Sequence, residues 1–262
     1  MAETRLLPGR RILVVGAGTR PSDDPGAPPG NGRAIAVTAA REGAAVACAD
    51  IDEAAAADTA KLITESGGAA HVLAGDAADP DACARIVTAA VQALDGLDGV
   101  VFNPGIGVGY GLSGTEPADW DRVLAVNLRG PFLTSKAAMP LLGEGAAMVF
   151  VGSLAGTKPG TLSPSYDASK AGLTGLVRHV AAEGAPRGVR ANVVAPGLID
   201  TVMGRAASAG NSARDRAAKL VPLGRQGTAW EVAEVAVFLL SERASYVTGQ
   251  VIGVDGGLST LR

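Results

Sequence analysis

The segments RRILVVGAGT (residues 10–19) and GNGRAIAVTAAREGAAVACAD (residues 30–50) decide the fold. The apolar run 12–15 ends in a glycine-rich turn, and the Ala-rich amphipathic stretch 31–42 leads to a second apolar run, 45–49. A short strand, a crossover helix and another short strand form a βαβ unit with parallel strands. Glycines between strand and helix let backbone N–H groups approach a phosphate, and the amino end of the helix adds a favourable field. These segments therefore predict a phosphate-binding loop after the first strand.

The same alternation continues along the rest of the chain. Apolar runs typical of strands covered on both faces recur at 71–74, 99–102, 147–151, 190–194 and 251–254. Amphipathic stretches typical of helices lie at 53–66, 80–93, 118–141, 166–183 and 229–241. We therefore expect an α/β protein of Rossmann type, with a doubly wound seven-stranded parallel sheet, helices on both faces and one domain over residues 1–262.

Two segments break this rhythm. Residues 20–30 contain four prolines and cannot form a helix or a central strand. Residues 201–220 are rich in small and polar residues, have helical potential and follow the sixth strand. Because ligands bind beyond the carboxyl ends of strands in open α/β sheets, both segments are expected near a binding site, with a substrate lid over about 198–222.

The composition excludes several classes of protein. Of 262 residues, 47% are hydrophobic and 19% are charged, as in a globular protein with a substantial core. The 23 basic and 26 acidic residues give a net charge of −3 without a basic cluster, so no nucleic-acid partner is expected. No apolar run approaches the ~20 residues that span a bilayer, and the amino-terminal segment lacks a signal-peptide core, so no membrane association is expected.

The cysteines and histidines complete this picture. Cys48 and Cys83 cannot form a disulfide framework, which indicates a cytoplasmic location. His71 and His179 lie far apart in the sequence and have no ligand partners at metal-binding spacing, so no metal site is expected.

Asp50 stands at the end of the second predicted strand. A carboxylate there can accept hydrogen bonds from both hydroxyls of an adenosine ribose, and it would repel a 2′-phosphate. The position favours NAD over NADP. The alternative interpretation is a solvated acid in a loop.

Tyr166, Lys170 and Ser153 form a second candidate group. Tyr166 and Lys170 lie four residues apart on a predicted helix and project from one face, and Ser153 follows the fifth predicted strand. A tyrosine pKa of ~10 is too high for a base near neutral pH, but a neighbouring ammonium favours the phenolate. The serine hydroxyl can hold a carbonyl or carbinol oxygen. We predict acid/base chemistry here, against the alternative of a helix-surface pattern without function.

A serine hydrolase is excluded by the residues around Ser153. In the stretch 152–156 (GSLAG), Val151 occupies the place where a nucleophile elbow needs glycine. No histidine lies nearby in the sequence to act as a base.

Taken together, these features resemble the short-chain dehydrogenase/reductase family over about residues 9–257. The motifs occur in order and at family-like spacing: Gly16, Gly30 and Gly32, then Asp50, Asp76, Asn103-Pro104-Gly105, Asn127, Ser153, YDASK at 166–170, PGLIDT at 196–201, VTGQ at 247–250 and VDGG at 254–257. The resemblance implies hydride transfer to or from a nicotinamide, and a homo-oligomer, either a dimer or a tetramer.

The resemblance also implies a role for each matching residue. Tyr166 would be the acid/base, Lys170 would hold the nicotinamide ribose and lower the tyrosine pKa, and Ser153 would orient the substrate oxygen. Asn127 would support a proton relay through Lys170, and Ile199 would cover the nicotinamide amide with Thr201 on the pyrophosphate. The expected cofactor-binding residues are Gly16, Gly18, Asn31, Gly32, Asp50, Ile51, Asp76, Ala77, Asn103, Gly105, Tyr166, Lys170, Pro196, Gly197, Ile199 and Thr201.

The chain departs from the family pattern in two places. Gly16 and Gly30 are separated by thirteen residues where the family has three, so residues 20–29 look like an insertion in the phosphate loop. We expect this loop to fold over the adenosine side and contribute to cofactor binding, with Arg20 as a further contact; the alternative is a solvated loop without a role. Phe102 replaces a polar residue of the family, which removes hydrogen bonding between neighbouring strands.

These predictions lead to an oxidoreductase that transfers a hydride between NAD(H) and a secondary alcohol or ketone. The expected substrate pocket carries no charged anchor, which indicates a neutral substrate, and its walls are Ile106, Val108, Leu154, Ala155, Thr157, Pro159, Gly160, Leu198, Val202 and Met203.

Three alternatives remain. A 3-oxoacyl-thioester (acyl carrier protein) reductase would use NADPH and want basic residues after the second strand, where 51–53 (IDE) offer none. A non-catalytic NAD-binding subunit would be expected to lose Tyr166 or Lys170. Enoyl reductases of the family space these two residues more widely.

Overall fold

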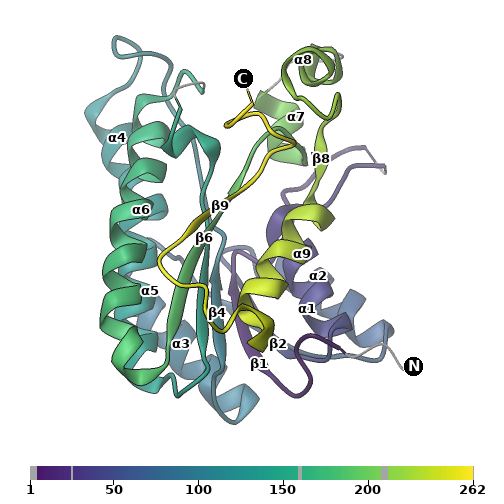
Figure 1. The fold of residues 1–262 in the computed structure, drawn as a ribbon, viewed down its shortest axis with the longest axis vertical. Coiled ribbons are helices and arrows are strands. Elements are labelled where there is room, and N and C mark those ends of the chain that lie inside the picture. The colour runs from purple at the N-terminus through teal and green to yellow at the C-terminus, as the bar shows by residue number, and fades with distance from the viewer. Residues whose placement is uncertain (1–4, 25, 159–160, 208–211, 262) are drawn as a thin grey trace.

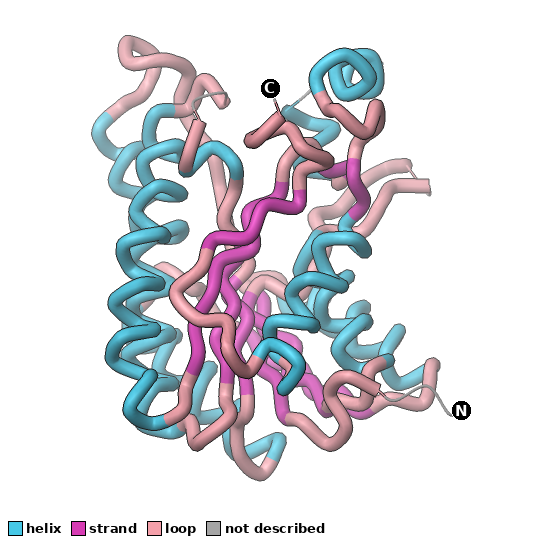
Figure 2. The backbone as a smooth tube through the Cα atoms, viewed as in Figure 1, coloured by secondary structure: helices cyan, strands magenta, loops and turns pink. Residues whose placement is uncertain are grey.

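The computed structural model describes residues 5–24, 26–158, 161–207 and 212–261. Within them, seven parallel strands form one sheet in the order β3-β2-β1-β4-β5-β6-β9 (Figures 1 and 2). The strands are β1 (Arg11–Val15), β2 (Ala45–Asp50), β3 (Ala69–Ala74), β4 (Gly99–Phe102), β5 (Ala147–Val151), β6 (Arg190–Pro196) and β9 (Val251–Val254). The predicted Rossmann-type sheet is therefore confirmed, and each predicted apolar run forms one of its strands.

Helices cover both faces of the sheet, as expected from the crossovers between parallel strands. Figure 1 shows α1 (Asn31–Arg41), α2 (Glu53–Glu65) and α9 (Ala229–Leu240) on one side. On the other side lie α3 (Pro80–Leu94), α4 (Pro117–Leu124), α5 (Gly130–Ala138) and α6 (Pro164–Gly184).

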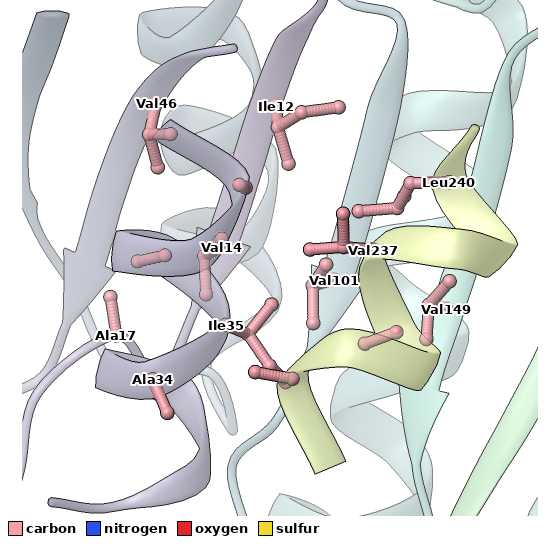
Figure 3. Packing of buried hydrophobic residues seen from close by; sticks show 14 of the residues in the cluster. Ile12, Val14, Ala17, Ala34, Ile35, Val46, Val101, Val149, Val237 and Leu240 are labelled. Atoms are coloured by element: carbon pink, nitrogen blue, oxygen red, sulfur yellow. The ribbon is translucent and has the colours of Figure 1, made fainter. Parts of the chain in front are cut away.

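The alternation of side chains along β1 divides the core between these two layers. Ile12 and Val14 are buried against α1 and α9, in the cluster shown in Figure 3. Leu13 and Val15 are buried in the second cluster, with residues of α3 and α6. A central strand with both faces covered needs apolar residues at every position, which explains the uninterrupted run ILVV.

The edge strand β3 corrects one prediction. The run 71–74 was expected to be covered on both faces, but most of β3 is exposed, and Val72 keeps 37% of its surface accessible. The physical reason is its place at the edge of the sheet, where only β2 pairs with it. An apolar run alone does not distinguish an edge strand from a central one.

The predicted helix 118–141 is divided into four pieces. A π-helical turn (Ala125–Arg129) separates α4 from α5, and a short 3-10 turn (Met139–Leu141) ends the segment. The turn carries Asn127 at its centre, and π turns inside helices are frequent at functional sites.

The predicted lid has more structure than its sequence indicated. β7 (Ile199–Asp200) pairs with β8 (Gly227–Thr228), and α7 (Val202–Ala207) and α8 (Ser212–Leu220) lie between them in the chain. The strand order reverses beside β1, whose neighbours are β2 and β4, so a crevice is expected beyond the carboxyl ends of β1 and β4.

Candidate active site

The glycine-rich loop crosses α1 at very close range. Gly16 has a φ of +75°, in the left-handed region that favours glycine. A Cβ on Gly32 would lie 1.8 Å from the Gly16 carbonyl oxygen, so a side chain at Gly32 is excluded. That oxygen also accepts a hydrogen bond from Asn103 Nδ2 at 2.9 Å. The glycines therefore let the loop after β1 rest directly on the first turn of α1.

Asp50 is held at the rim of this loop. Its carboxylate accepts hydrogen bonds from the Gly18 N–H at 2.8 Å and from the Asp52 N–H at 3.1 Å. The neighbouring Ile51 is 70% exposed. Asp50 is thus a partly buried carboxylate with a fixed orientation, rather than a freely solvated loop acid.

A cleft of about 490 Å³ opens beyond the carboxyl ends of β1, β2, β4 and β5. The sequence-predicted residues that line it are Gly16, Gly18, Asn31, Asp50, Ile51, Asp76, Ala77, Asn103, Gly105, Tyr166, Lys170 and Thr201. The parallel sheet thereby brings residues that are far apart in the sequence, such as Gly16 and Thr201, to one site.

Six predicted residues do not line the cleft: Gly32, Asn127, Ser153, Pro196, Gly197 and Ile199. Gly32 lies at the point where the loop after β1 crosses α1, and a Cβ on Gly197 would lie 2.7 Å from the Cβ of Asp255. Ile199 is buried in the core cluster that includes α1 and α9 and does not line the cleft, so its predicted contact with the nicotinamide amide stays a prediction.

Other lining residues were missed in the sequence or named only as walls of the substrate pocket. Arg122 and Val126 line the cleft from α4 and the π turn, and they lie four residues apart on one helical face. Their four-residue spacing on the predicted helix 118–141, just before Asn127, is the signal that would have found them. Thr19, Arg20 and Pro21 line the cleft where the inserted loop begins.

Tyr166 and Lys170 lie together on α6, as their spacing predicts. The Lys170 Nζ is 5.6 Å from the centroid of the Tyr166 ring and donates a hydrogen bond to the Val151 carbonyl at 2.9 Å. Only 5% of Lys170 is exposed. Burial lowers the pKa of Lys170 to about 8, because a charged ammonium is poorly solvated there.

The pKa of Tyr166 moves in the opposite direction to the prediction. Burial raises it above the ordinary value of 10, while the hydrogen bond with Ser153 lowers it and the nearby Asp167 charge raises it. Lys170 is not among the causes of the shift. The expected lowering by the ammonium is therefore wrong for the protein alone, since desolvation of the phenolate dominates.

Ser153 and Asn127 are fixed by backbone contacts around this pair. Ser153 caps the short 3-10 turn Leu154–Gly156, and its hydroxyl accepts a hydrogen bond from the Ala155 N–H at 3.1 Å. Asn127 is fully buried; its Oδ1 accepts from the Ile106 N–H and its Nδ2 donates to the Ile106 carbonyl, both at 2.9 Å. Asn127 thereby sets the position of the loop after β4.

Phe102 replaces polar contacts with packing. It is buried in the second core cluster, and a Cβ on Gly130 would lie 3.0 Å from its ring. Phe102 therefore makes an apolar contact between β4 and α5.

The site fits a dinucleotide at the start of α1. The helix begins after Gly30 without a side-chain cap, which leaves amino-terminal N–H groups for an anion. The Asn31 Oδ1 is buried, and within the described residues it has no hydrogen-bond partner. A buried acceptor of this kind is costly unless a ligand or water satisfies it, so Asn31 Oδ1 and Asp50 suit the hydroxyls of a ligand, whereas the free N–H groups of α1 suit its phosphates.

Within the ranges that the structure describes, no group of three or more His, Cys, Asp or Glu side chains could hold a metal ion. No helix in the same ranges combines the length and apolarity needed to cross a membrane. Of the predicted substrate-pocket walls, Ile106, Val202 and Met203 line the cleft, whereas Pro159 and Gly160 lie outside the described residues.

Comparisons with known proteins agree with this geometry. A family model described as enoyl-(acyl carrier protein) reductase matches residues 26–259. The 2-(S)-hydroxypropyl-CoM dehydrogenase 3 of Xanthobacter autotrophicus is 37% identical over 239 residues, which cover 88% of this chain and 93% of that protein. The 3-oxoacyl-(acyl-carrier-protein) reductase of Thermotoga maritima is 37% identical over 254 residues, 96% of this chain and 98% of that protein.

A solved structure extends the likeness to three dimensions. A short-chain dehydrogenase from Burkholderia cenocepacia, crystallised in complex with NADP, has a TM-score of 0.88 and 32% identity, with 97% of this chain and all of that chain covered. The matched length, the sheet order and the Tyr166/Lys170 pair on α6 together establish that the chain belongs to the short-chain dehydrogenase/reductase family, whose members are NAD(P)-dependent oxidoreductases of alcohols and ketones.

Proposed function

We propose that residues 1–262 form one catalytic unit that transfers a hydride between NAD(H) and a secondary alcohol or ketone. The observation that carries this proposal is the pair formed by the partly buried Tyr166 and the buried Lys170 at the cleft wall, with Ser153 among the groups that act on the phenol pKa. A bound nicotinamide supplies the hydride acceptor or donor. The protein then needs only to orient the substrate oxygen and to move one proton.

Each residue of the group has a distinct task in the proposed reaction. Ser153 orients the substrate oxygen, and Tyr166 gives it a proton in reduction or takes one in oxidation. The raised pKa of Tyr166 keeps the phenol protonated at neutral pH, which is the form that donates. Lys170, with a pKa of about 8, is mostly protonated at neutral pH and would hold the nicotinamide ribose. Asn127 would support proton supply through Lys170.

Asp50 supports NAD as the preferred cofactor. Its carboxylate is fixed by the Gly18 N–H at the rim of the cleft, where a 2′-phosphate would meet a like charge. Arg20 also lines the cleft and favours the alternative, an NADPH-dependent 3-oxoacyl-thioester reductase. The spacing of Tyr166 and Lys170 favours the carbonyl/alcohol type over an enoyl reductase.

Part of the cleft wall supports a neutral, apolar substrate, while Arg20 and Arg122 bring positive charge to the same cleft. Ile106, Val202 and Met203 line it. The loop that continues from Ile106 carries the exposed Tyr110 and Leu112, and its Gly111 N–H donates to the Leu162 carbonyl at 2.7 Å. The loops after β4 and β5 are therefore joined by a hydrogen bond next to exposed apolar side chains.

Two further properties belong to the proposal. The exposed Phe132 on α5 and Trp120 on α4 support a homo-oligomer, since large exposed apolar residues commonly mark interfaces. Gly172 does not belong to such an exposed surface, because a Cβ on it would lie 2.7 Å from Leu128 of the same chain.

The buried free thiols of Cys48 and Cys83 are compatible with a reducing cytoplasm.

The test begins with calorimetric titration of the protein with NADH and, separately, NADPH. We expect clear preference for NADH, followed by NAD⁺-dependent oxidation of apolar secondary alcohols. Tyr166→Phe should lower kcat by about 10²-fold or more with NADH affinity retained. Tyr246→Phe, which alters a fully exposed tyrosine, should leave both unchanged. Binding of NADPH alone would favour the thioester reductase, and NADH binding without any turnover would favour a non-catalytic subunit.

A further inference from the structure

The inserted loop leaves and re-enters the fold at one point. The Gly30 N–H, at the start of α1, donates to Thr19 Oγ1 at 3.0 Å and closes the base of the loop. Arg20 and Pro21, immediately after that closure, line the cofactor cleft. Figure 1 shows the loop projecting at the same end of the molecule as α7 and α8. The insertion is therefore a strap beside the cleft rather than an addition to a distant surface.

Asp24, in the middle of this strap, has a defined orientation. One carboxylate oxygen accepts a hydrogen bond from the Gly26 N–H at 2.8 Å, and the Ala27 N–H donates to the Asp24 carbonyl at 3.0 Å. The second carboxylate oxygen lies 3.1 Å from Nη1 of Arg205 on α7. The local turn thus aims one oxygen of Asp24 at the lid, 181 positions away in the sequence.

Arg205 is equally well fixed. Its Nε and Nη2 donate to the two carboxylate oxygens of Asp200 at 2.7 and 3.0 Å, which leaves Nη1 directed at Asp24. Such a two-point contact holds the planar guanidinium in one orientation. The same helix begins with Val202 and Met203, which line the cleft. Arg205 therefore lies on the same helical turn as residues of the cleft wall.

We propose that the Asp24–Arg205 ion pair is a latch between strap and lid that slows exchange of the cofactor, a role that rests on the proposed dinucleotide binding. Strap and α7 border the same cleft, and the ion pair joins them. A dinucleotide leaves fastest when the two segments separate, so the pair sets part of the barrier to release. Asp24 acts through Arg205 and is a positioning residue.

The exposure of the pair sets the size of the effect. The side chains of Arg205 and Asp24 are 39% and 54% exposed. Exposed ion pairs are weak and are screened by salt, so removing this one should raise the rate of release about two- to five-fold.

The experiment measures NADH release by stopped-flow fluorescence, with excess NAD⁺ to trap the free site. Asp24→Asn keeps an acceptor for the Gly26 N–H but removes the charge, and we expect release two- to five-fold faster than in the wild type. Asp23→Asn removes the same charge from the neighbouring exposed position of the strap and should leave the rate unchanged. About 1 M NaCl should accelerate release from the wild type toward the Asp24→Asn rate and should have little effect on that variant.

A double-mutant cycle separates the latch from a general effect on folding. Arg205→Gln should accelerate release, and adding Asp24→Asn to it should bring no further increase, because the contact is already lost. Equal rates for the wild type and Asp24→Asn, or additive effects of the two substitutions, would overturn the latch. Failure of wild-type protein to bind NADH would instead overturn the proposed function, so the two failures are distinguishable.

Discussion

Replacing Lys170 by methionine should show how much the buried ammonium lowers the free energy of unfolding. Lys170 is 5% exposed, and burial lowers its pKa from 10.5 to about 8. At ~1.4 kcal/mol per pH unit, this difference means that the protonated lysine destabilises the folded state by about 3 kcal/mol. Methionine fills similar space without a charge, so Lys170→Met removes that penalty along with the hydrogen bond to Val151.

The penalty has a defined dependence on pH. Below pH 8 the lysine is protonated in the folded and unfolded states, so the penalty is complete. Between about pH 8 and 10.5 the folded protein releases this proton while the unfolded chain retains it, so wild-type stability rises with pH. Between pH 7 and 9.5, the wild type should therefore gain about 2 kcal/mol of unfolding free energy relative to Lys170→Met.

The assay is urea unfolding of the protein without cofactor, followed by the fluorescence of its two tryptophans. Taking the difference between wild type and variant at each pH cancels the titration of all groups that both proteins share. Lys136→Met, which removes an exposed lysine from α5, controls for the loss of a surface charge and should show no such trend. A difference between the wild type and Lys170→Met that stays constant from pH 7 to 9.5 would refute the assignment of a depressed pKa to Lys170.

Two further predictions concern the phosphate loop. Gly32→Ala should destabilise the protein by about 2 kcal/mol or more and weaken NADH binding, because the new Cβ would lie 1.8 Å from the Gly16 carbonyl oxygen. The control is Gly175→Ala on α6, where an added Cβ would meet no atom from outside its own stretch of helix within 4 Å. Thermal unfolding should show that this control stabilises the protein. Asn31→Leu should raise the Kd for NADH about five- to tenfold, because the Asn31 side chain would no longer contact the cofactor. The stability of the cofactor-free protein should be unchanged or higher, since the substitution removes a buried acceptor that lacks a partner. An unchanged affinity in calorimetry would contradict a role for this side chain.

The sheet could be predicted from the sequence because its strands carry a strong physical signal. A strand covered on both faces needs apolar residues at each position, and short runs such as 12–15 and 147–151, which are rich in β-branched or aromatic residues, match this need. Exposure could not be predicted in the same way. The run 71–74 (HVLA) is also mostly apolar, but β3 lies at the edge, and position in a sheet depends on pairing rather than on composition.

The candidate site was predictable where its geometry is local. Tyr166 and Lys170 share a helix face, so their spacing is sufficient to bring them together. The pKa of Tyr166 was predicted in the wrong direction because burial is a property of the whole fold, and it outweighs the Ser153 hydrogen bond. Asn127 lies in a π turn, and no pattern of residues in the sequence predicts such a turn. Its hydrogen bonds to Ile106 depend on the path of the loop after β4, which is a property of the whole fold.

The inserted strap marks the limit of such reasoning. Its prolines exclude regular structure, and its place after β1 puts it at the carboxyl edge of the sheet, where the lid also lies. Both facts follow from the sequence, and they bring the two segments near each other without pairing any of their residues. Asp23 and Asp24 are the same residue type in neighbouring positions, but only Asp24 accepts the hydrogen bond from the Gly26 N–H that fixes its carboxylate. The orientation of Arg205 is set separately, by its hydrogen bonds to Asp200. A contact between two irregular segments thus depends on side-chain orientations set separately on each side, which is why the strap's partner had to be found in the structure.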